Sequence, residues 1–443
     1  MTYLSYAYRN LWEDPSIALR IETDIERARK SEVRVRVTTP EGAPLPGVRV
    51  AARQTASSFH FGANIFLLDG YDSPARNAAY EQAYLALFNA ATVPFYWKGI
   101  EPERGKRRYN VDSPTVVRRP PPDRVIAFCE NHGLRMHGHP LVWDFSQWSV
   151  PEWLDALPMA KQTRLWQEHV TDIATRYGTR IRRWDVVNEV LETARRGQGR
   201  PGSVPMPDDY GRRAFEWARE ALPIDTERYI NEATAVWNPA NLKLWINYIR
   251  RLQSLGMRVD GAGLQFHLFH DEELRNMLRG ESRTPLELFR VLDQLSPLNL
   301  PLHISEITLT SLDDDAAGRD AQAEAARNLY RLWFSQPLVR GITWWNLPDG
   351  GACAGEDRVY SGLLDASLEP KPAYDALHHL IHEEWRTRVH LRTDTNGCVT
   401  FRAFHGEYEV QLDDGEVITR SVESSLPSVK WDLVPENLPM TTR

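Results

Sequence analysis

The feature that most constrains this chain is a repeated alternation of short apolar runs with longer amphipathic stretches along its central region. Eight apolar runs occur in order, at residues 59–66, 89–97, 133–143, 181–189, 228–233, 261–268, 302–309 and 341–349. Stretches with helical spacing of apolar residues separate most of them, for example residues 151–178 and 320–336. Eight strand–helix units in about 325 residues predict an α/β fold whose parallel sheet closes into a (β/α)8 (TIM) barrel.

Two β-rich segments flank this central region. Val alternates with polar residues in residues 31–39, a turn-rich stretch follows, and residues 48–55 alternate again, which predicts a β-hairpin. Residues 387–443 contain further short alternating strands separated by turns. Because an isolated hairpin is only marginally stable and chain termini often lie close together, we expect residues 31–57 and 387–443 to form one small β-sandwich. Their pattern is similar to that of carboxypeptidase-regulatory-like β-sandwiches.

The remaining boundaries follow from these assignments. A broken apolar stripe with many charges opposite predicts a helix over residues 1–30. The barrel is then expected over residues 58–386, inserted between the two parts of the sandwich.

Composition and charge argue against several classes of protein. The chain has 53 Lys and Arg against 60 Asp and Glu, and its net charge of −7 argues against a nucleic-acid partner. No run approaches the roughly 20 apolar residues of a membrane helix, so no membrane partner is expected. Three distant cysteines without a CxxC pair argue against a disulfide framework or a zinc ribbon. No secretory signal is visible, so we expect a cytoplasmic protein, or a secreted one if a leader has been removed. Composition leaves the oligomeric state open.

Polar and aromatic side chains close the apolar runs. In (β/α)8 barrels the active site lies at the carboxyl ends of the strands. The residues at these ends are Asn64, Tyr96, Trp97, His137, His139, Asn188, Glu189, Asn231, Glu232, Gln265, His267, Glu306, Trp344 and Trp345. Carboxylates, amides, imidazoles and indoles at one end of a barrel predict a catalytic site. The chain has 15 Trp, whose flat rings suit stacking on sugars, although a single Trp is more often a core anchor.

Glu189 and Glu306 are the most informative pair. Each follows an apolar strand, so we expect both carboxyl groups at the mouth of the barrel. Glycoside hydrolysis requires two such groups: an acid that protonates the leaving oxygen and an ionised group that attacks the anomeric carbon. The alternative is that each glutamate is a salt-bridged residue at the end of a strand, which the neighbouring Asn188, His267 and Trp345 make less favourable.

Several motifs together resemble family 10 of the glycoside hydrolases, a family of retaining xylanases. WDVVNE resembles its acid/base motif, and HISEITL resembles its nucleophile strand. Further similarities are HGHPLVW to H-T-L-V-W, GLQFH to L-Q-G-H, GITWWNLPD to G-I-T-x-W-G, IEPERGKRRYN to E-P-x-x-G-x-F-x-F, and SLEPKPAYDAL to the closing helix. They cover residues 59–385 in order. The resemblance implies endo-1,4-β-xylanase-like hydrolysis of a β-linked oligo- or polysaccharide, by double displacement and without a cofactor.

The resemblance also implies a role for each matching residue. Glu189 becomes the general acid/base, and Glu306 becomes the nucleophile. Asn188 is expected to bond the sugar 2-hydroxyl, His267 to orient Glu306, and Gln265 to support Glu189 or a water channel. His139 is expected beside the central sugar, and Trp345 beneath it. The other candidates for sugar binding are Trp143, Tyr96 and Trp97. For His139 and His267 the alternative is a purely structural histidine.

The departures from the family pattern concern sugar recognition. Where the family usually has E-N-E-M-K-W, whose Glu, Asn and Lys bind sugar, this chain has Thr92 to Trp97 in an ungapped alignment. Asp144 stands where a second histidine is expected, and Asn346 where a glycine is expected. A site that has lost hydroxyl-binding groups discriminates differently among sugars. A β-glycosidase acting on a non-xylan glycoside is therefore the alternative within the family.

Two alternative functions from other classes of protein remain. His137 and His139 resemble an H-x-H ligand pair, so one alternative is a metal-dependent hydrolase, although no metal site is predicted because later strand ends lack the further ligands. The other is a non-catalytic carbohydrate-binding protein, which would be expected to have lost one of the two glutamates.

Overall fold

The computed structural model describes residues 3–191, 210–353, 360–413 and 415–435. Its contacts divide the chain into two compact units. One unit contains the residues up to Trp12 together with His60–Trp333 and Leu338–Ala376, and the other contains Glu13–Phe59, Phe334–Pro337 and the residues from Leu377 onward. We describe them as the barrel unit and the sandwich unit.

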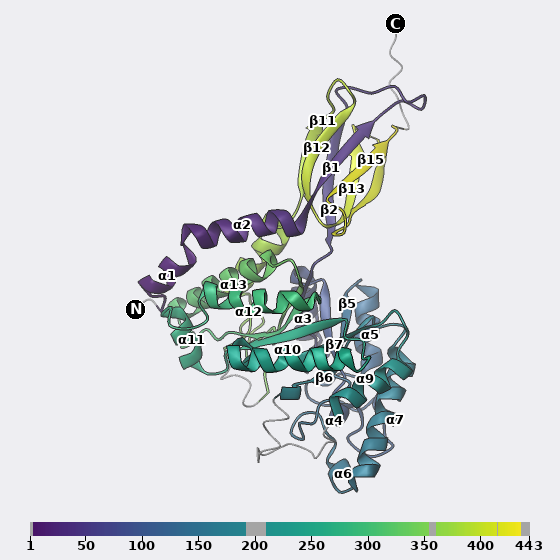
Figure 1. Cartoon of the computed structure of the whole chain (residues 1–443), viewed down its shortest axis with the longest axis vertical. Coiled ribbons are helices and arrows are strands. Elements are labelled where there is room, and N and C mark those ends of the chain that lie inside the picture. The colour runs from purple at the N-terminus through teal and green to yellow at the C-terminus, as the bar shows by residue number, and fades with distance from the viewer. Residues whose placement is uncertain (1–2, 192–209, 354–359, 414, 436–443) are drawn as a thin grey trace. The chain divides into compact units, whose positions relative to one another are not determined.

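The barrel unit contains a closed barrel of eight parallel strands, which confirms the predicted fold (Figure 1). The strands are β3 (His60–Asn64), β4 (Ala90–Pro94), β5 (Arg135–His139), β6 (Arg183–Asn188), β7 (Glu227–Glu232), β8 (Gly261–His267), β9 (Leu302–Thr308) and β10 (Val339–Trp344). They neighbour one another in sequence order, and β10 closes the ring against β3. Each of the eight predicted apolar runs overlaps one of these strands, and six of the runs contain the whole strand. Strands β6, β8 and β9 are buried along their whole length, as expected for a parallel sheet covered on both faces.

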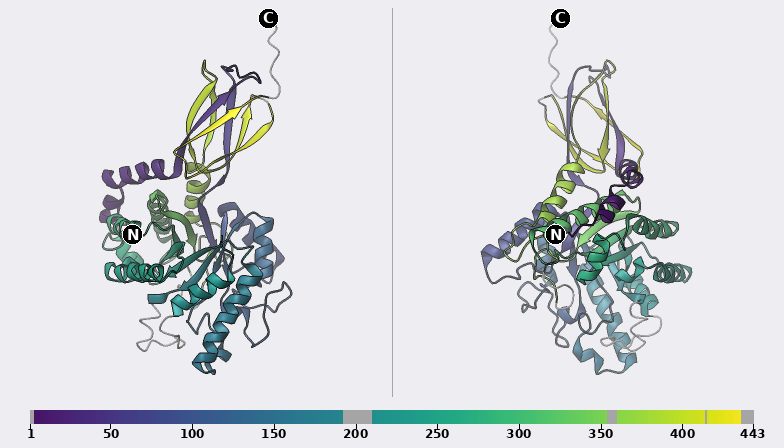
Figure 2. Two further views of the ribbon diagram at one scale, coloured as in Figure 1. Left: turned by 45° about the vertical axis from the view of Figure 1, so that its right-hand side comes forward. Right: turned by 90° about the vertical axis from the view of Figure 1, so that its left-hand side faces the viewer.

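Helices surround the barrel strands, as the further views show (Figure 2). They are α3 (Pro74–Leu87), α4 (Trp97–Ile100), α5 (Pro122–Asn131), α6 (Glu152–Asp155), α7 (Met159–Tyr177), α9 (Tyr210–Ala221), α10 (Pro239–Ser254), α11 (Asp271–Leu278), α12 (Pro285–Leu295), α13 (Ala316–Ser335) and α14 (Pro372–His379), with short helices at Thr234–Trp237 and Ser296–Leu298. A further short helix, Leu380–Glu384, belongs to the sandwich unit. The long helices are amphipathic: α7 buries Trp166, Val170 and Ile173 on one face. Among the described helices, none is both long and apolar enough to cross a membrane.

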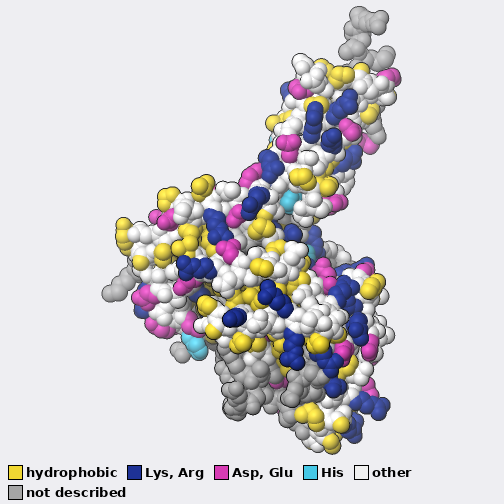
Figure 3. All heavy atoms as spheres, viewed as in Figure 1, with side chains coloured by type: hydrophobic (Ala, Val, Ile, Leu, Met, Phe, Trp, Pro, Cys, Tyr) yellow, Lys and Arg dark blue, Asp and Glu magenta, His cyan; other side chains and the backbone are white. Residues whose placement is uncertain are grey.

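The sandwich unit contains two small sheets built from both flanking segments. Its strands are β1 (Lys30–Val37), β2 (Arg49–Ser57), β11 (Arg388–Arg392), β12 (Cys398–Phe404), β13 (Gly406–Leu412), β14 (Val417–Val422) and β15 (Ser428–Leu433). One sheet has the order β12-β1-β15 and the other β11-β2-β13-β14. All pairs are antiparallel except β1 with β15. Charged side chains of both signs are visible on the exposed surface of this unit (Figure 3).

The predicted hairpin over residues 31–55 is wrong. Strands β1 and β2 lie in different sheets, each paired with strands of the C-terminal segment. Their alternation serves a shared core, because Val33 and Val35 of β1 join Val50 of β2 and Trp431 of β15 in one buried cluster. Alternation alone marks the buried face of a strand and does not identify its partner.

The single helix predicted over residues 1–30 is also wrong, because the structure has two. Helix α1 (Tyr6–Trp12) belongs to the barrel unit, and α2 (Pro15–Arg29) belongs to the sandwich unit. The break occurs at Asp14, which is extended and whose side chain accepts a hydrogen bond from the Ser16 amide at 2.8 Å. Proline at position 15 disfavours a helical residue before it and favours the first turn of a new helix.

Candidate active site

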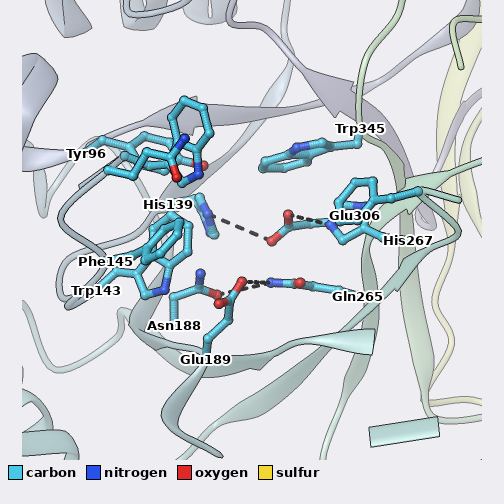
Figure 4. Close-up of a pocket in the computed structure, with 13 residues that line it drawn as sticks. Tyr96, His139, Trp143, Phe145, Asn188, Glu189, Gln265, His267, Glu306 and Trp345 are labelled. Carbon is cyan, nitrogen blue, oxygen red and sulfur yellow. Dashed lines mark hydrogen bonds and ion pairs between the residues drawn. The ribbon is translucent and has the colours of Figure 1, made fainter. Parts of the chain in front are cut away.

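A cavity of about 350 Å³ opens at the carboxyl end of the barrel. Its lining residues are Tyr96, His139, Trp143, Phe145, Gln147, Trp148, Asn188, Glu189, Gln265, His267, Phe269, Glu306 and Trp345. They include both predicted catalytic glutamates and every residue predicted to bind substrate except Trp97. Figure 4 shows Glu189 and Glu306 in this cavity, with the His139 ring directed toward Glu306 and the Gln265 amide toward Glu189.

Glu306 is buried near the end of β9 and is held by several polar groups. Asn231 Nδ2 donates to its Oε1 at 2.8 Å, and His267 Nε2 lies 3.1 Å from its Oε2. His139 Nε2 lies 3.8 Å from Oε1. The pairing of β8 with β9 shifts register between Leu264 and Gln265, opposite Ile304 and Glu306. Such a bulge re-aims side chains, and here both Glu306 and the preceding Ser305 reach Asn231.

Burial dominates the electrostatics of Glu306. Desolvation raises its pKa to about 8, and the nearby charges of Glu189 and Asp185 act in the same direction. His139 and the hydrogen bond from Asn231 oppose this rise.

Asn231 is a central contact of this site whose role the sequence does not indicate. It lies in β7 and its Nδ2 also donates to Asn188 Oδ1 at 2.9 Å, while its Oδ1 accepts from Ser305 at 2.6 Å. A glycine is required beside it, because a Cβ on Gly263 would lie 2.1 Å from Asn231 Oδ1. Its position at a strand end was visible in the sequence, but no motif marked it as a ligand of Glu306.

Glu189 lies at the end of β6 in an unusual backbone conformation. Its φ is +56°, in the left-handed region, and its amide donates to Asn231 O at 2.8 Å. A non-glycine residue held there costs of order 1–3 kcal/mol, a strain often found at functional sites. Its Oε1 lies 3.3 Å from Gln265 Nε2, and its side chain is less buried than that of Glu306.

A buried aspartate holds His139. Nδ1 of His139 lies 2.8 Å from Asp185 Oδ2, and His137 Nε2 lies 3.0 Å from Asp185 Oδ1. Burial disfavours the charged form of Asp185, but the two histidines outweigh it and hold the pKa of this carboxyl well below its usual range. An ionised Asp185 accepts from Nδ1, so Nε2 of His139 is the nitrogen that faces Glu306.

The H-x-H pair thus contacts one carboxylate from within the barrel. Among the described residues, no group of three or more His, Cys, Asp or Glu is arranged to hold a metal ion. His267 is likewise fixed on both ring nitrogens, with Nδ1 2.8 Å from Thr308 Oγ1 and Nε2 facing Glu306.

Aromatic rings form much of the remaining wall. Trp345 follows β10 and is nearly buried, and Tyr96 and Trp143 also line the cavity (Figure 4). Phe145, Trp148 and Phe269 also line the cavity, and Phe269 stacks on His267 with ring centroids 4.4 Å apart. Sequence reasoning missed these three residues and Gln147, because they lie in loops beyond the strands where no periodicity or motif marks them.

Trp97, predicted to bind substrate, does not line the cavity. It begins α4, which turns its side chain outward into the packing around α7. There it stacks on His169 with centroids 4.3 Å apart, meets Trp166 edge-on, and donates to Glu101 at 3.1 Å. Trp97 is thus a core residue of the barrel unit.

A (β/α)8 barrel with two carboxyl groups in one aromatic-lined cavity at its carboxyl end is the arrangement of a glycoside hydrolase. The sequence profile of "Glycosyl hydrolase family 10" matches residues 76–380. The chain belongs to this family.

The chain is also similar to several known proteins and solved structures. Endo-1,4-beta-xylanase 2 of Arabidopsis thaliana is 26% identical over 405 residues, 90% of this chain and 34% of its own length. Anti-sigma-I factor RsgI6 of Acetivibrio thermocellus is 27% identical over 388 residues, 88% of this chain and 45% of its own length. The chain thus spans less than half of these two relatives. The crystal structure of xylanase 10B from Thermotoga petrophila RKU-1 in complex with xylobiose shares the fold, with a TM-score of 0.59 at 23% identity over 74% of this chain and 95% of that one.

Proposed function

We propose that this protein hydrolyses β-glycosidic bonds with retention of the anomeric configuration, with Glu306 as nucleophile and Glu189 as general acid/base. The observation that carries the proposal is the shared cavity: both carboxyl groups reach it from strands β9 and β6. Two carboxyl groups facing one sugar are the requirement of a double displacement.

In the first step, Glu306 attacks the anomeric carbon while Glu189 gives its proton to the leaving oxygen. The bond from the anomeric carbon to that oxygen breaks, and a glycosyl ester of Glu306 forms. The donors on Glu306 suit this role, because Asn231 and His267 fix its two oxygens in one orientation before reaction. Burial raises the pKa of Glu306 and so disfavours its ionised form in the empty site, whereas the positive charge that develops on the sugar in the transition state stabilises the attacking carboxylate.

In the second step, Glu189 takes a proton from water, which attacks the same carbon and releases Glu306. One water is consumed for each bond cleaved, and the acid has become the base. The greater exposure of Glu189 supports this role, since its carboxyl group must meet both the leaving group and water. Gln265, 3.3 Å from Glu189, positions it for both steps.

The substrate class is a β-linked oligo- or polysaccharide. Several similar proteins are named endo-1,4-β-xylanases, and one similar structure is a complex with xylobiose. These similarities support xylo-oligosaccharides as the first candidate substrates. Asn188, His139 and Trp345 line the cavity where a sugar would contact both glutamates.

A second candidate is another β-glycoside. It is favoured by the residues that replace the family's charged and amide groups, since Thr92 is buried in β4 and Tyr96 presents an aromatic ring to the cavity. Sites that lose hydroxyl partners select different sugars.

The test is product release from xylan, xylo-oligosaccharides and a panel of gluco-, galacto- and manno-configured β-glycosides. Glu306→Gln serves as the inactive blank. Glu227→Gln is the matched control, because Glu227 begins β7 at the opposite end of the barrel and pairs with Arg183. We expect products from the wild type and from Glu227→Gln only, with the β-anomer appearing first by NMR. Equal residual activity in Glu306→Gln, or an α-anomer first, would contradict the proposal.

A further inference from the structure

One side of the cavity ends in a closed set of rings. Four rings contact one another edge-to-face in a closed cycle. The distances between ring centroids are 5.7 Å from Phe66 to Tyr96, 5.5 Å from Tyr96 to His139, 5.6 Å from His139 to Trp345, and 5.3 Å from Trp345 back to Phe66. Tyr96, His139 and Trp345 line the cavity, whereas Phe66 is 1% exposed and fills the space behind them. Edge-to-face packing of this kind is stable without a ligand.

Two arginines from the segment before α5 lie behind these rings. The guanidinium of Arg119 is 3.8 Å from the centroid of the Tyr96 ring and 5.1 Å from that of Phe66. Arg118 lies 5.5 Å from the Phe66 ring and donates to Asn346 Oδ1 at 2.7 Å. We call Phe66, Tyr96, Arg118, Arg119 and Asn346 the β3–β4 wall.

The wall depends on local features of this sequence. Gly99 leaves room for Arg119, because a Cβ there would lie 2.8 Å from Arg119 Cγ. Asn346, where the family pattern has glycine, accepts hydrogen bonds from Arg118 and from Asn64 Nδ2 at 3.3 Å. Tyr96 stands where the pattern has lysine. Two of the residues that depart from the family motifs, Tyr96 and Asn346, therefore belong to this one structure.

The position of the wall relates it to one end of the substrate. Glu189 follows β6, and in the ring of eight strands β10 lies opposite β6, with β3 as its neighbour. The leaving group must lie on the side of its acid, Glu189, so the sugars before the cleaved bond extend toward β10 and β3, the strands that Asn346 and Phe66 follow. There Phe66, Arg118 and Asn346 are each less than 7% exposed, so the space is occupied by protein.

We propose that the β3–β4 wall closes the cavity beyond the single sugar that contacts Glu306, so that the enzyme removes one sugar at a time from the non-reducing end of a β-glycoside. Each turnover consumes one water and yields a monosaccharide and a chain shortened by one unit. The inference rests on the proposed function and replaces the internal cleavage that the family resemblance implies.

The first experiment uses the wild-type protein with nitrophenyl β-xyloside and β-xylobioside, and the corresponding glucoside and cellobioside. We expect nitrophenol from a monoside without delay, and from its bioside only after a lag in which the monosaccharide appears. Immediate release of nitrophenol together with the free disaccharide would overturn the inference while leaving the proposed hydrolysis intact. No release from any substrate, relative to Glu306→Gln, would overturn the proposed function and the inference with it.

The second experiment removes one aromatic side chain from the β3–β4 wall. Tyr96→Ala is expected to raise kcat/KM for the bioside relative to the monoside by about tenfold, the value of one good sugar contact. Tyr71→Ala is the matched control, because Tyr71 also carries an arginine on its ring, Arg76 at 4.5 Å, but does not line the cavity. Thermal melting shows whether both variants are folded. The ratio of kcat/KM for the bioside to kcat/KM for the monoside does not depend on the amount of active enzyme. An unchanged ratio in Tyr96→Ala, or an equal change in Tyr71→Ala, would overturn the assignment of the wall.

Discussion

Replacing Asn231 by alanine removes the 2.8 Å hydrogen bond to Glu306 Oε1 without altering either glutamate. A hydrogen bond to a charged group contributes about 1.5–3 kcal/mol, and each pH unit of pKa corresponds to about 1.4 kcal/mol. The Asn231 amide stabilises the ionised form of Glu306, so its loss makes ionisation harder. We therefore expect the pKa of Glu306 to rise above its value of about 8 in Asn231→Ala.

The consequence for activity follows from the role of Glu306. Because the nucleophile reacts only when ionised, kcat/KM of the wild type should rise with pH up to about 8. In Asn231→Ala this rise should move to higher pH, and activity at neutral pH should fall about 10- to 100-fold. An activated dinitrophenyl glycoside is the substrate of choice, because its departure depends little on protonation by Glu189.

The control is Asn241→Ala, since Asn241 lies on α10 and donates to Ala235 O at 3.0 Å, outside the cavity. Its pH profile should match that of the wild type. A fall in the activity of Asn231→Ala at every pH, with the ascending limb unmoved, would refute the electrostatic reasoning, provided that thermal melting shows a folded variant.

Three further predictions concern the same site. Glu189→Ala should lose most activity on alkyl glycosides and much less on activated aryl glycosides; equal losses on both would argue against its role as acid. Asp185→Asn should destabilise the fold by about 3 kcal/mol at pH 7, because His137 and His139 lose a buried charged partner. The pKa of Asp185 is lowered in the folded state, so its contribution to the free energy of unfolding is present above about pH 4 and is lost as the pH falls through the lowered value. Urea unfolding should therefore show a smaller difference in stability between the wild type and Asp185→Asn at pH 2 than at pH 7. Activity should be unchanged after dialysis against a chelator, and a loss restored by added zinc would favour the metal-dependent alternative.

The barrel was predictable because its signal is local and repeated. Each apolar run is one buried strand, and position at the carboxyl end of a barrel strand brings residues such as Glu189 and Glu306 into one cavity regardless of their separation in sequence. That the two flanking segments together form one small sandwich was also predictable, but its strand pairing was not, because pairing depends on contacts between segments more than 300 residues apart, such as Val33 with Phe401.

The parts of the site that escaped prediction depend on geometry that no short motif carries. Trp97 and Tyr96 are adjacent in sequence, yet the start of α4 sends one ring into the core and leaves the other in the cavity. The contact of Asn231 with Glu306 depends on a bulge in the sheet and on the space left by Gly263. Arg119 reaches Tyr96 from a segment with no recognisable pattern.

The most direct test of the account is to trap the covalent intermediate. A dinitrophenyl 2-deoxy-2-fluoro-β-glycoside slows the second step, so the sugar should accumulate on the enzyme when it matches the substrate preference found in the panel. We predict one added sugar by intact-mass spectrometry, located by peptide mapping on Glu306, and none in Glu306→Gln. A sugar on another residue, or an enzyme that turns over the parent glycoside without a trapped ester and with inversion, would contradict the assignment of Glu306 as nucleophile.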